Sequence, residues 1–219
     1  MSSLIFFTDA EQALVATDTL ATSPDGQPLM FTTKAFVLPH LRMVIAGTGA
    51  GRFLGKWFIQ LNDRIAVKDI DNLNYHAPQT LTTLWVELLD ELPGLAGTTT
   101  TVYHFGFSET DGQIHTFAYR SASEFRSEAI PYGLGVKPAF AVPEEYQLPR
   151  DLKGMMDAQR EVQMAKPHGE RVYIGGEITV NHLTKHGFAA YTLDRFADYA
   201  ADESVIYRNI AAQKKKAVQ

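Results

Sequence analysis

The first fifty residues are divided into four short strand candidates that lead into a glycine-rich segment and a helix. Each candidate is rich in apolar or β-branched residues, and polar turns such as Ser23-Pro24-Asp25-Gly26 separate them. The candidates cover residues 2–7, 13–22, 31–38 and 42–46. The N-terminal part of the chain is therefore expected to build a sheet, after which Gly47-Thr48-Gly49-Ala50-Gly51 opens the first helix.

Helical and strand patterns alternate in blocks along the rest of the chain. Apolar residues at helical spacing predict three helices, and β-branched or aromatic runs bounded by turn residues predict further strands. The helices are expected over 50–62, 78–92 and 151–166, and the strands over 98–108, 113–120, 128–132 and, as a final pair, within 172–194. Two helices that follow a run of strands can cover one face of a layered sheet. Periodicity alone predicts an α+β fold with two sheets and three or more helices.

Three polar residues in the strand candidates form a chemical pattern. Asp18 follows Ser2 by sixteen residues, and Lys34 follows it by thirty-two. If Met1 is removed, Ser2 carries both a hydroxyl and a free α-amine, which titrates at about 7.7–8.0 and can act as a general base near neutral pH. Because a serine hydroxyl is a weak nucleophile at its free pKa, activation by its own amine is a known solution.

The motif around Asp18 is Ala16-Thr17-Asp18-Thr19-Leu20-Ala21-Thr22, Lys34 stands on the third strand candidate, and the glycine-rich segment follows the fourth. This arrangement resembles the proteasome β-subunit family of N-terminal nucleophile hydrolases, including the related bacterial ATP-dependent peptidase subunits. The resemblance is dense over residues 2–60 and architectural beyond them. It implies a four-layer αββα sandwich in a single domain over residues 1–213. The Lys214-Lys215-Lys216 run predicts that 214–219 form a disordered basic tail.

The family resemblance also implies a mechanism without a cofactor or a metal ion. Ser2 Oγ would attack an amide carbonyl, in a peptide or a related substrate, and its α-amine would accept the proton through a water. Lys34, held by Asp18, would favour the neutral amine by placing positive charge beside it. Backbone N–H groups of Gly47, Thr48 and Gly49 would bind the oxyanion. An acyl-enzyme ester on Ser2 is the implied intermediate.

Three positions depart from the family pattern. Leu134 stands where the family commonly has the serine of Gly-Ser-Gly, and Arg171 and Ile174 replace the Asp and Ser of an Asp-x-x-Ser-Gly-Gly element. These changes leave open an alternative, a catalytically inactive scaffold subunit with the same fold. Under either interpretation the resemblance implies a homo-oligomeric, ring-like assembly of at least six subunits. The sequence shows neither an unfoldase partner nor the preferred substrate.

The composition excludes several other classes of protein. A net charge of −5 argues against nucleic-acid binding, which needs a basic surface. The absence of cysteine removes disulfides, thiolate metal sites and thiol nucleophiles, and is consistent with the cytoplasm. No signal peptide and no apolar run of membrane-spanning length is evident, so a cytoplasmic protein without membrane contact is expected.

Three weaker patterns compete with this interpretation. The Gly97-Thr98 junction looks like a self-processing site, but no Asp or Lys stands sixteen and thirty-two residues beyond it. Residues 49–57 come near a phosphate-binding loop, but Trp57 replaces the hydroxyl that would hold Mg²⁺. His182 and His186 have a spacing that suits zinc on a helix, yet their segment is predicted to be strand and turn.

Overall fold

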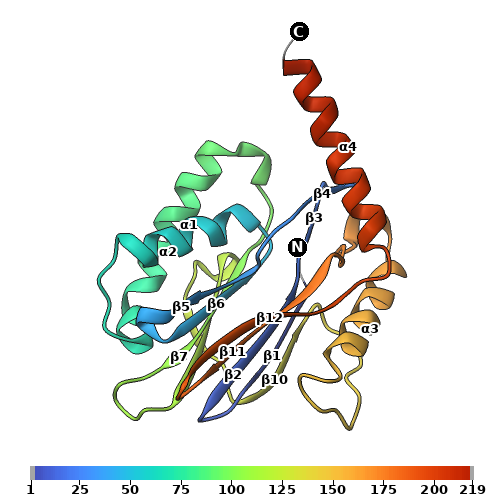
Figure 1. Cartoon of the computed structure of the whole chain (residues 1–219). Helices are drawn as coiled ribbons and strands as arrows, with labels where there is room; N and C mark the ends of the chain where they lie inside the picture. The colour runs from blue at the N-terminus through green and yellow to red at the C-terminus, as the bar shows by residue number, and fades with distance from the viewer. Residues whose placement is uncertain (1–2, 218–219) are drawn as a thin grey trace.

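The computed structural model describes residues 3–217, and the side chains as far as residue 212. Two five-stranded sheets, in which all paired strands are antiparallel, make up most of the body (Figure 1). The first has the order β10-β1-β2-β11-β12, with β1 (Leu4–Thr8), β2 (Gln12–Asp18), β10 (Gly133–Lys137), β11 (Glu177–Thr184) and β12 (Gly187–Arg195). The second runs from β5 to β9, with β5 (Ala35–Leu38), β6 (Met43–Thr48), β7 (Thr101–Phe107), β8 (Ile114–Arg120) and β9 (Ser127–Ala129). A separate ribbon pairs β3 (Leu20–Thr22) with β4 (Pro28–Phe31).

Helices lie on opposite sides of this pair of sheets. Figure 1 shows α1 and α2 together beside the β5–β9 sheet, α3 beside the other sheet, and α4 projecting away from the body. Their bounds are Gly51–Asp63 for α1, Ile70–Glu91 for α2, Leu152–Met164 for α3 and Tyr199–Ala217 for α4. Short 3-10 turns span Pro39–Leu41, Pro93–Leu95, Ser121–Ser123 and His168–Glu170. Among the residues described, no helix combines the length and the apolar character that a membrane span requires.

The core consists of three apolar clusters. One joins the facing sides of the two sheets, where Phe6 of β1 packs against Phe105 of β7 with ring centroids 5.0 Å apart. A second fills the space between α1, α2 and the β5–β9 sheet, and a third lies under α3. These clusters, built from helix stripes and alternating strand residues, confirm the predicted α+β class.

The predicted second and third strands are each broken, and both breaks occur at the polar residues singled out above. The strand expected over 13–22 divides into β2 and β3 after Asp18, because the N–H groups of Thr19 and Leu20 both donate hydrogen bonds to Gly175 O. The strand expected over 31–38 is interrupted at 32–34, where Thr32 N–H donates to Thr19 O. Lys34 therefore lies just before β5 and not within a strand.

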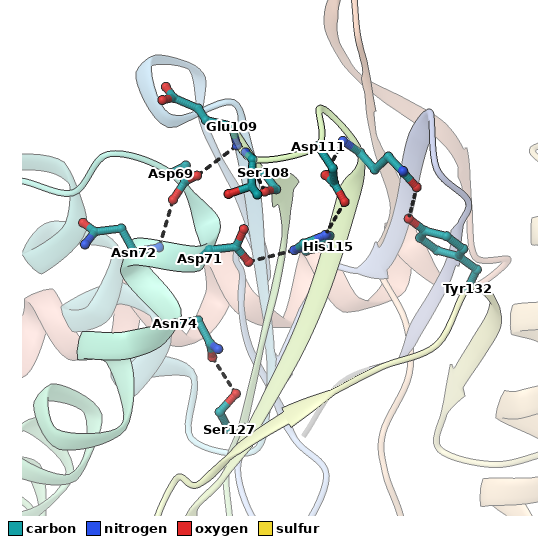
Figure 2. A network of polar contacts seen from close by, with 12 residues as sticks. Asp69, Asp71, Asn72, Asn74, Ser108, Glu109, Asp111, His115, Ser127 and Tyr132 are labelled. Carbon is teal, nitrogen blue, oxygen red and sulfur yellow. Dashed lines mark hydrogen bonds and ion pairs between the residues drawn. The ribbon is translucent and has the colours of Figure 1, made fainter.

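The second helix begins eight residues earlier than its predicted start at Pro78. Asp69 caps it by accepting a hydrogen bond from Asn72 N–H at 2.8 Å, and its other carboxylate oxygen accepts one from Glu109 N–H at 2.9 Å (Figure 2). Pro78 lies inside α2. A proline is most common at the first turn of a helix, so the sequence pattern placed the start too late.

Two further elements were not predicted. The strand β10 contains Gly133 and Gly135, which weaken a strand pattern, but a Cβ at Gly135 would lie 2.1 Å from the Phe6 ring. The helix α4 contacts β4, with Phe31 stacked on Tyr199 at 4.7 Å between centroids. The helix α4 extends to Ala217, so it includes residues 214–217, which were predicted to belong to a disordered basic tail.

Candidate active site

The Asp18 carboxylate, at the end of β2, joins three separate segments of the chain. Asp18 is fully buried. Its Oδ1 accepts hydrogen bonds from Lys34 Nζ at 2.8 Å and from Ser3 N–H at 2.9 Å, and its Oδ2 accepts one from Gly175 N–H at 3.1 Å. A buried carboxylate needs such donors to replace its lost hydration. Asp18 thus fixes the N-terminal strand, the Lys34 segment and the approach to β11 relative to one another.

The Lys34 side chain turns inward and is held at two points. Besides its ion pair with Asp18, Nζ donates to Leu20 O at 2.6 Å, and only 8% of the side chain is exposed. An ammonium group has three donors, so one N–H remains beyond these two contacts. The Asp18–Lys34 pair that the resemblance implied is therefore formed, and Lys34 offers a fixed positive charge to its surroundings.

A cavity of about 150 Å³ opens beside Lys34. Its wall is formed by the turn between β6 and α1, by Leu54 of α1 and by the segments around β3 and β5. Hydroxyl-bearing side chains and glycine backbone surround it, and its apolar lining residues are Ala21, Ala50 and Leu54. The space suits a small or medium-sized side chain next to a fixed cation.

Ser2, the predicted nucleophile, lies outside the described residues, as does Met1. Ser3, the next residue, is fully buried and its N–H donates to Asp18 as described above. Its Oγ donates to Gln159 Oε1 of α3 at 2.5 Å, and Gln159 Nε2 donates to Pro138 O at 2.7 Å. Sequence reasoning missed Ser3 and Gln159. A signal existed, since Gln159 continues the inner face of α3 that Leu152 and Met156 begin.

The three predicted oxyanion donors differ in their surroundings. Gly47 N–H donates to Lys34 O at 3.2 Å, so this donor is already engaged. Thr48 ends β6 and lines the cavity beside Lys34. Gly49 has a φ of 101°, and a Cβ there would lie 2.2 Å from Thr99 O. The register of β6 with β7 pairs Thr48 with Thr101, so the Thr48 N–H is engaged in the sheet. Only glycine fits the turn that follows, and the Gly49 N–H is the one of the three donors that no sheet pairing engages.

The three positions that depart from the family pattern do not point functional groups at Asp18. Leu134 and Ile174 pack in the apolar cluster under α3, and Arg171 Nε donates to Lys166 O at 2.5 Å. The backbone of the same segment nevertheless reaches the site. Gly175 N–H donates to Asp18, and Gly175 O accepts from Thr19 and Leu20.

The competing patterns do not form sites within the described residues. Trp57 is buried and its Nε1 donates to His104 Nε2 at 2.8 Å, so the segment 49–57 packs as a core helix. Burial lowers the pKa of His104 to about 3, which keeps the ring neutral as an acceptor. His182 Nε2 lies 2.8 Å from Gln12 Oε1, and His186 is in the turn after β11. The described part of the chain holds no cluster of three His, Cys, Asp or Glu residues that could bind a metal.

Comparison with known proteins shows the fold. No family model and no curated protein matches the chain. Among similar solved structures, Anbu (ancestral beta-subunit) from Yersinia bercovieri has a TM-score of 0.59 and 9% identity, and the match covers 99% of this chain and 97% of the Anbu chain. The Anbu (Gly-1) mutant from Hyphomicrobium sp. strain MC1 has a TM-score of 0.59 and 10% identity, with 100% and 97% covered. A helical assembly of the Anbu complex from Pseudomonas aeruginosa has a TM-score of 0.59 and 10% identity, with 98% and 95% covered. Over its whole length, the chain therefore shares the fold of these proteasome-like subunits.

Proposed function

We propose that this chain is a proteasome-like N-terminal nucleophile hydrolase that cleaves amide bonds with Ser2. The observation that carries the proposal is the buried Asp18–Lys34 pair, to which the N–H of Ser3 is hydrogen-bonded. This contact connects the residue that follows Ser2 to the Asp18–Lys34 pair. Among the lysine–carboxylate pairs of the described residues, this is the one in which both side chains are less than one-tenth exposed. A nucleophile placed there would lie near a fixed cation, a cavity and the backbone N–H of Gly49.

The proposed reaction balances without a cofactor. After removal of Met1, Ser2 Oγ attacks the carbonyl carbon while its proton passes through a water to the α-amine. The Gly49 N–H group stabilises the oxyanion. The C–N bond breaks, the leaving amine takes the proton, and Ser2 carries an ester. Water activated by the same amine then hydrolyses the ester and regenerates Ser2. Lys34 favours the neutral amine because a nearby positive charge opposes its protonation.

The cavity beside Lys34 is proposed to receive the substrate side chain on the acyl side of the scissile bond. Its volume of about 150 Å³ and the apolar surface of Leu54 favour a small or medium-sized apolar side chain. The proposal extends to a four-layer αββα arrangement and to a homo-oligomeric, ring-like assembly, for which the shared fold is the support. The cytoplasmic location and the single domain over residues 1–213 stay predictions.

Intact mass and active-site labelling test the catalytic proposal. The mature protein should begin at Ser2, and a peptide epoxyketone or β-lactone should modify that residue. Ser2→Ala should abolish labelling. Thr98→Ala, which changes an exposed hydroxyl of the Gly97-Thr98 junction, is the matched control and should leave labelling intact. Labelling that survives Ser2→Ala, or no labelling of processed protein under conditions that label a proteasome, would refute the assignment.

A second candidate is a catalytically inactive scaffold subunit with the same fold. The observation that favours it is the apolar packing of Leu134 and Ile174 at positions where the family has hydroxyl groups. Retention of Met1 would support this alternative at once, because it blocks the α-amine. Both candidates predict an oligomer, so a monomeric mass by light scattering at micromolar concentration would contradict the assembly that they share.

A further inference from the structure

A second cavity is lined by the same turn that supplies the proposed oxyanion donor. Its volume is about 250 Å³, and it shares Thr48 and Gly49 with the cavity beside Lys34. Its remaining walls come from the start of β7, the end of β10 with the residues that follow, and Val172. Because both cavities border the Thr48–Gly49 turn, a substrate whose reacting carbonyl lies at this turn would have a cavity for a residue on each side of the scissile bond.

Lys137 is the charged group in this second cavity. It is the last residue of β10, it is half-buried, and its Nζ donates to Thr101 Oγ1 at 2.9 Å. Among the residues that the structure describes, no carboxylate forms an ion pair with Lys137; the nearby charge that acts on it is Arg120. Burial, together with the Arg120 charge, lowers the pKa of Lys137. Arg120 is itself paired with Glu128, whereas Lys137 has no carboxylate partner among the described residues. A half-buried cation without a counter-charge of its own is unfavourable until an anion joins it.

The position of Lys137 is fixed relative to the N-terminal segment. The carbonyl of Pro138, the next residue, accepts a hydrogen bond from Gln159 Nε2, and Gln159 Oε1 accepts one from Ser3 Oγ. Ser3 and Gln159 are fully buried, so this connection is shielded from water. The segment that carries the cation is thereby connected, through two side chains, to the residue that follows the proposed nucleophile.

We propose that Lys137 binds a substrate carboxylate on the leaving-group side of the scissile bond. The inference rests on the proposed function, because it places the acyl-side residue in the cavity beside Lys34. The carboxylate can come from an acidic side chain or from the C-terminus of a short peptide. Either source would supply the counter-charge that Lys137 lacks among the described residues, and Thr101 would orient the ammonium group toward it.

A matched set of peptides tests the preference. The peptides share one acyl side and differ beyond the scissile bond: an amidated neutral residue, an amidated Glu, and a neutral residue with a free carboxylate. We expect kcat/KM to be about tenfold to a hundredfold higher for at least one carboxylate peptide than for the neutral one. Lys137→Met should bring this ratio close to one, and Lys137→Arg should retain most of it. Lys56→Met, which removes a lysine at the exposed Glu91 pair, is the control and should leave the ratio unchanged.

The two carboxylate peptides identify the source, and equal rates for all three peptides would overturn the inference. So would a ratio that Lys137→Met leaves unaltered. If no peptide is cleaved, the Ser2 labelling described above decides the proposed function separately. Carboxylate binding is then measured in the Ser2→Ala protein, through acetylation of Lys137 by an N-hydroxysuccinimide ester. The carboxylate peptides should slow this acetylation and the neutral peptide should not; equal protection, or none, would reject the site.

Discussion

Removal of the Lys34 ammonium group would leave the Asp18 carboxylate buried without a counter-charge. Asp18 is fully buried, the Lys34 side chain is 8% exposed, and the two charged atoms are 2.8 Å apart. Loss of one partner of a buried ion pair costs about 3–5 kcal/mol of unfolding free energy. The N–H groups of Ser3 and Gly175 would still donate to Asp18. We therefore expect Lys34→Ala to cost about 3 kcal/mol, at the lower end of that range.

Urea unfolding at pH 7 measures this cost, with Lys56→Ala as the matched control. Lys56 pairs with Glu91 through side chains that are 31% and 53% exposed, so its loss should cost at most about 1 kcal/mol. The double variant Asp18→Asn/Lys34→Met removes both charges and should recover more than half of the loss. The reasoning is refuted if Lys34→Ala and Lys56→Ala destabilise the protein equally, or if the double variant is less stable than Lys34→Ala alone.

Two further predictions concern pH and backbone geometry. Burial opposes protonation of His115, but its hydrogen bonds to Asp71 and Asp111 outweigh burial and raise its pKa, so the folded state binds the proton more tightly (Figure 2). This stabilisation is fully present below the unfolded pKa of about 6.5 and is lost as pH rises through the folded pKa. His115→Gln should therefore lower the free energy of unfolding by up to about 1 kcal/mol at pH 5.5 and by less at pH 8.5, as measured by urea unfolding. An equal loss at both pH values would contradict this prediction. Gly49→Ala should lower the free energy of unfolding by at least about 2 kcal/mol, because Gly49 has a positive φ and lies against the Thr99 carbonyl. Gly55→Ala, in α1 with open space around it, is the control and should raise the free energy of unfolding by about 0.5–1 kcal/mol. Thermal unfolding compares the two variants, and a Gly49→Ala variant as stable as the unaltered protein would argue against the strained turn.

Local patterns predicted the elements whose side chains alternate or repeat regularly. The helix α1 and the hairpin of β11 and β12 were found because their apolar spacing and turn residues agree with the structure. Elements that depend on tertiary contacts were missed or misplaced. The strand β10 needs the Phe6 ring above Gly135, and α2 begins at a cap on Asp69 that also binds Glu109. The Gly135–Phe6 and Asp69–Glu109 contacts join distant segments and cannot be inferred from the neighbouring sequence, whereas the Asp69–Asn72 cap is a local signal that was overlooked.

The site was predictable where the family resemblance assigned particular residues to it. Asp18 and Lys34 were paired from sequence, and the structure places them in contact. The break at Lys34 and the engaged Gly47 N–H were not predictable, because both follow from a backbone bend whose donors and acceptors lie in distant segments. The Ser3–Gln159–Pro138 connection was missed for a related reason. It joins residues that are 156 and 21 positions apart in the chain.

The substitutions at Arg171 and Ile174 have a physical explanation in the way this segment reaches Asp18. The contact is made by the Gly175 N–H and not by a side chain, while Gly175 O receives the N–H groups of Thr19 and Leu20. Backbone contacts depend on where the chain runs, so they survive side-chain replacement as long as the path is kept. The path here is kept by glycine, since a Cβ at Gly176 would lie 2.4 Å from Thr19 Oγ1 and its φ is 80°. The Asp18–Lys34 pair can therefore remain intact in a chain that lacks the supporting hydroxyl and carboxylate groups of the pattern it resembles.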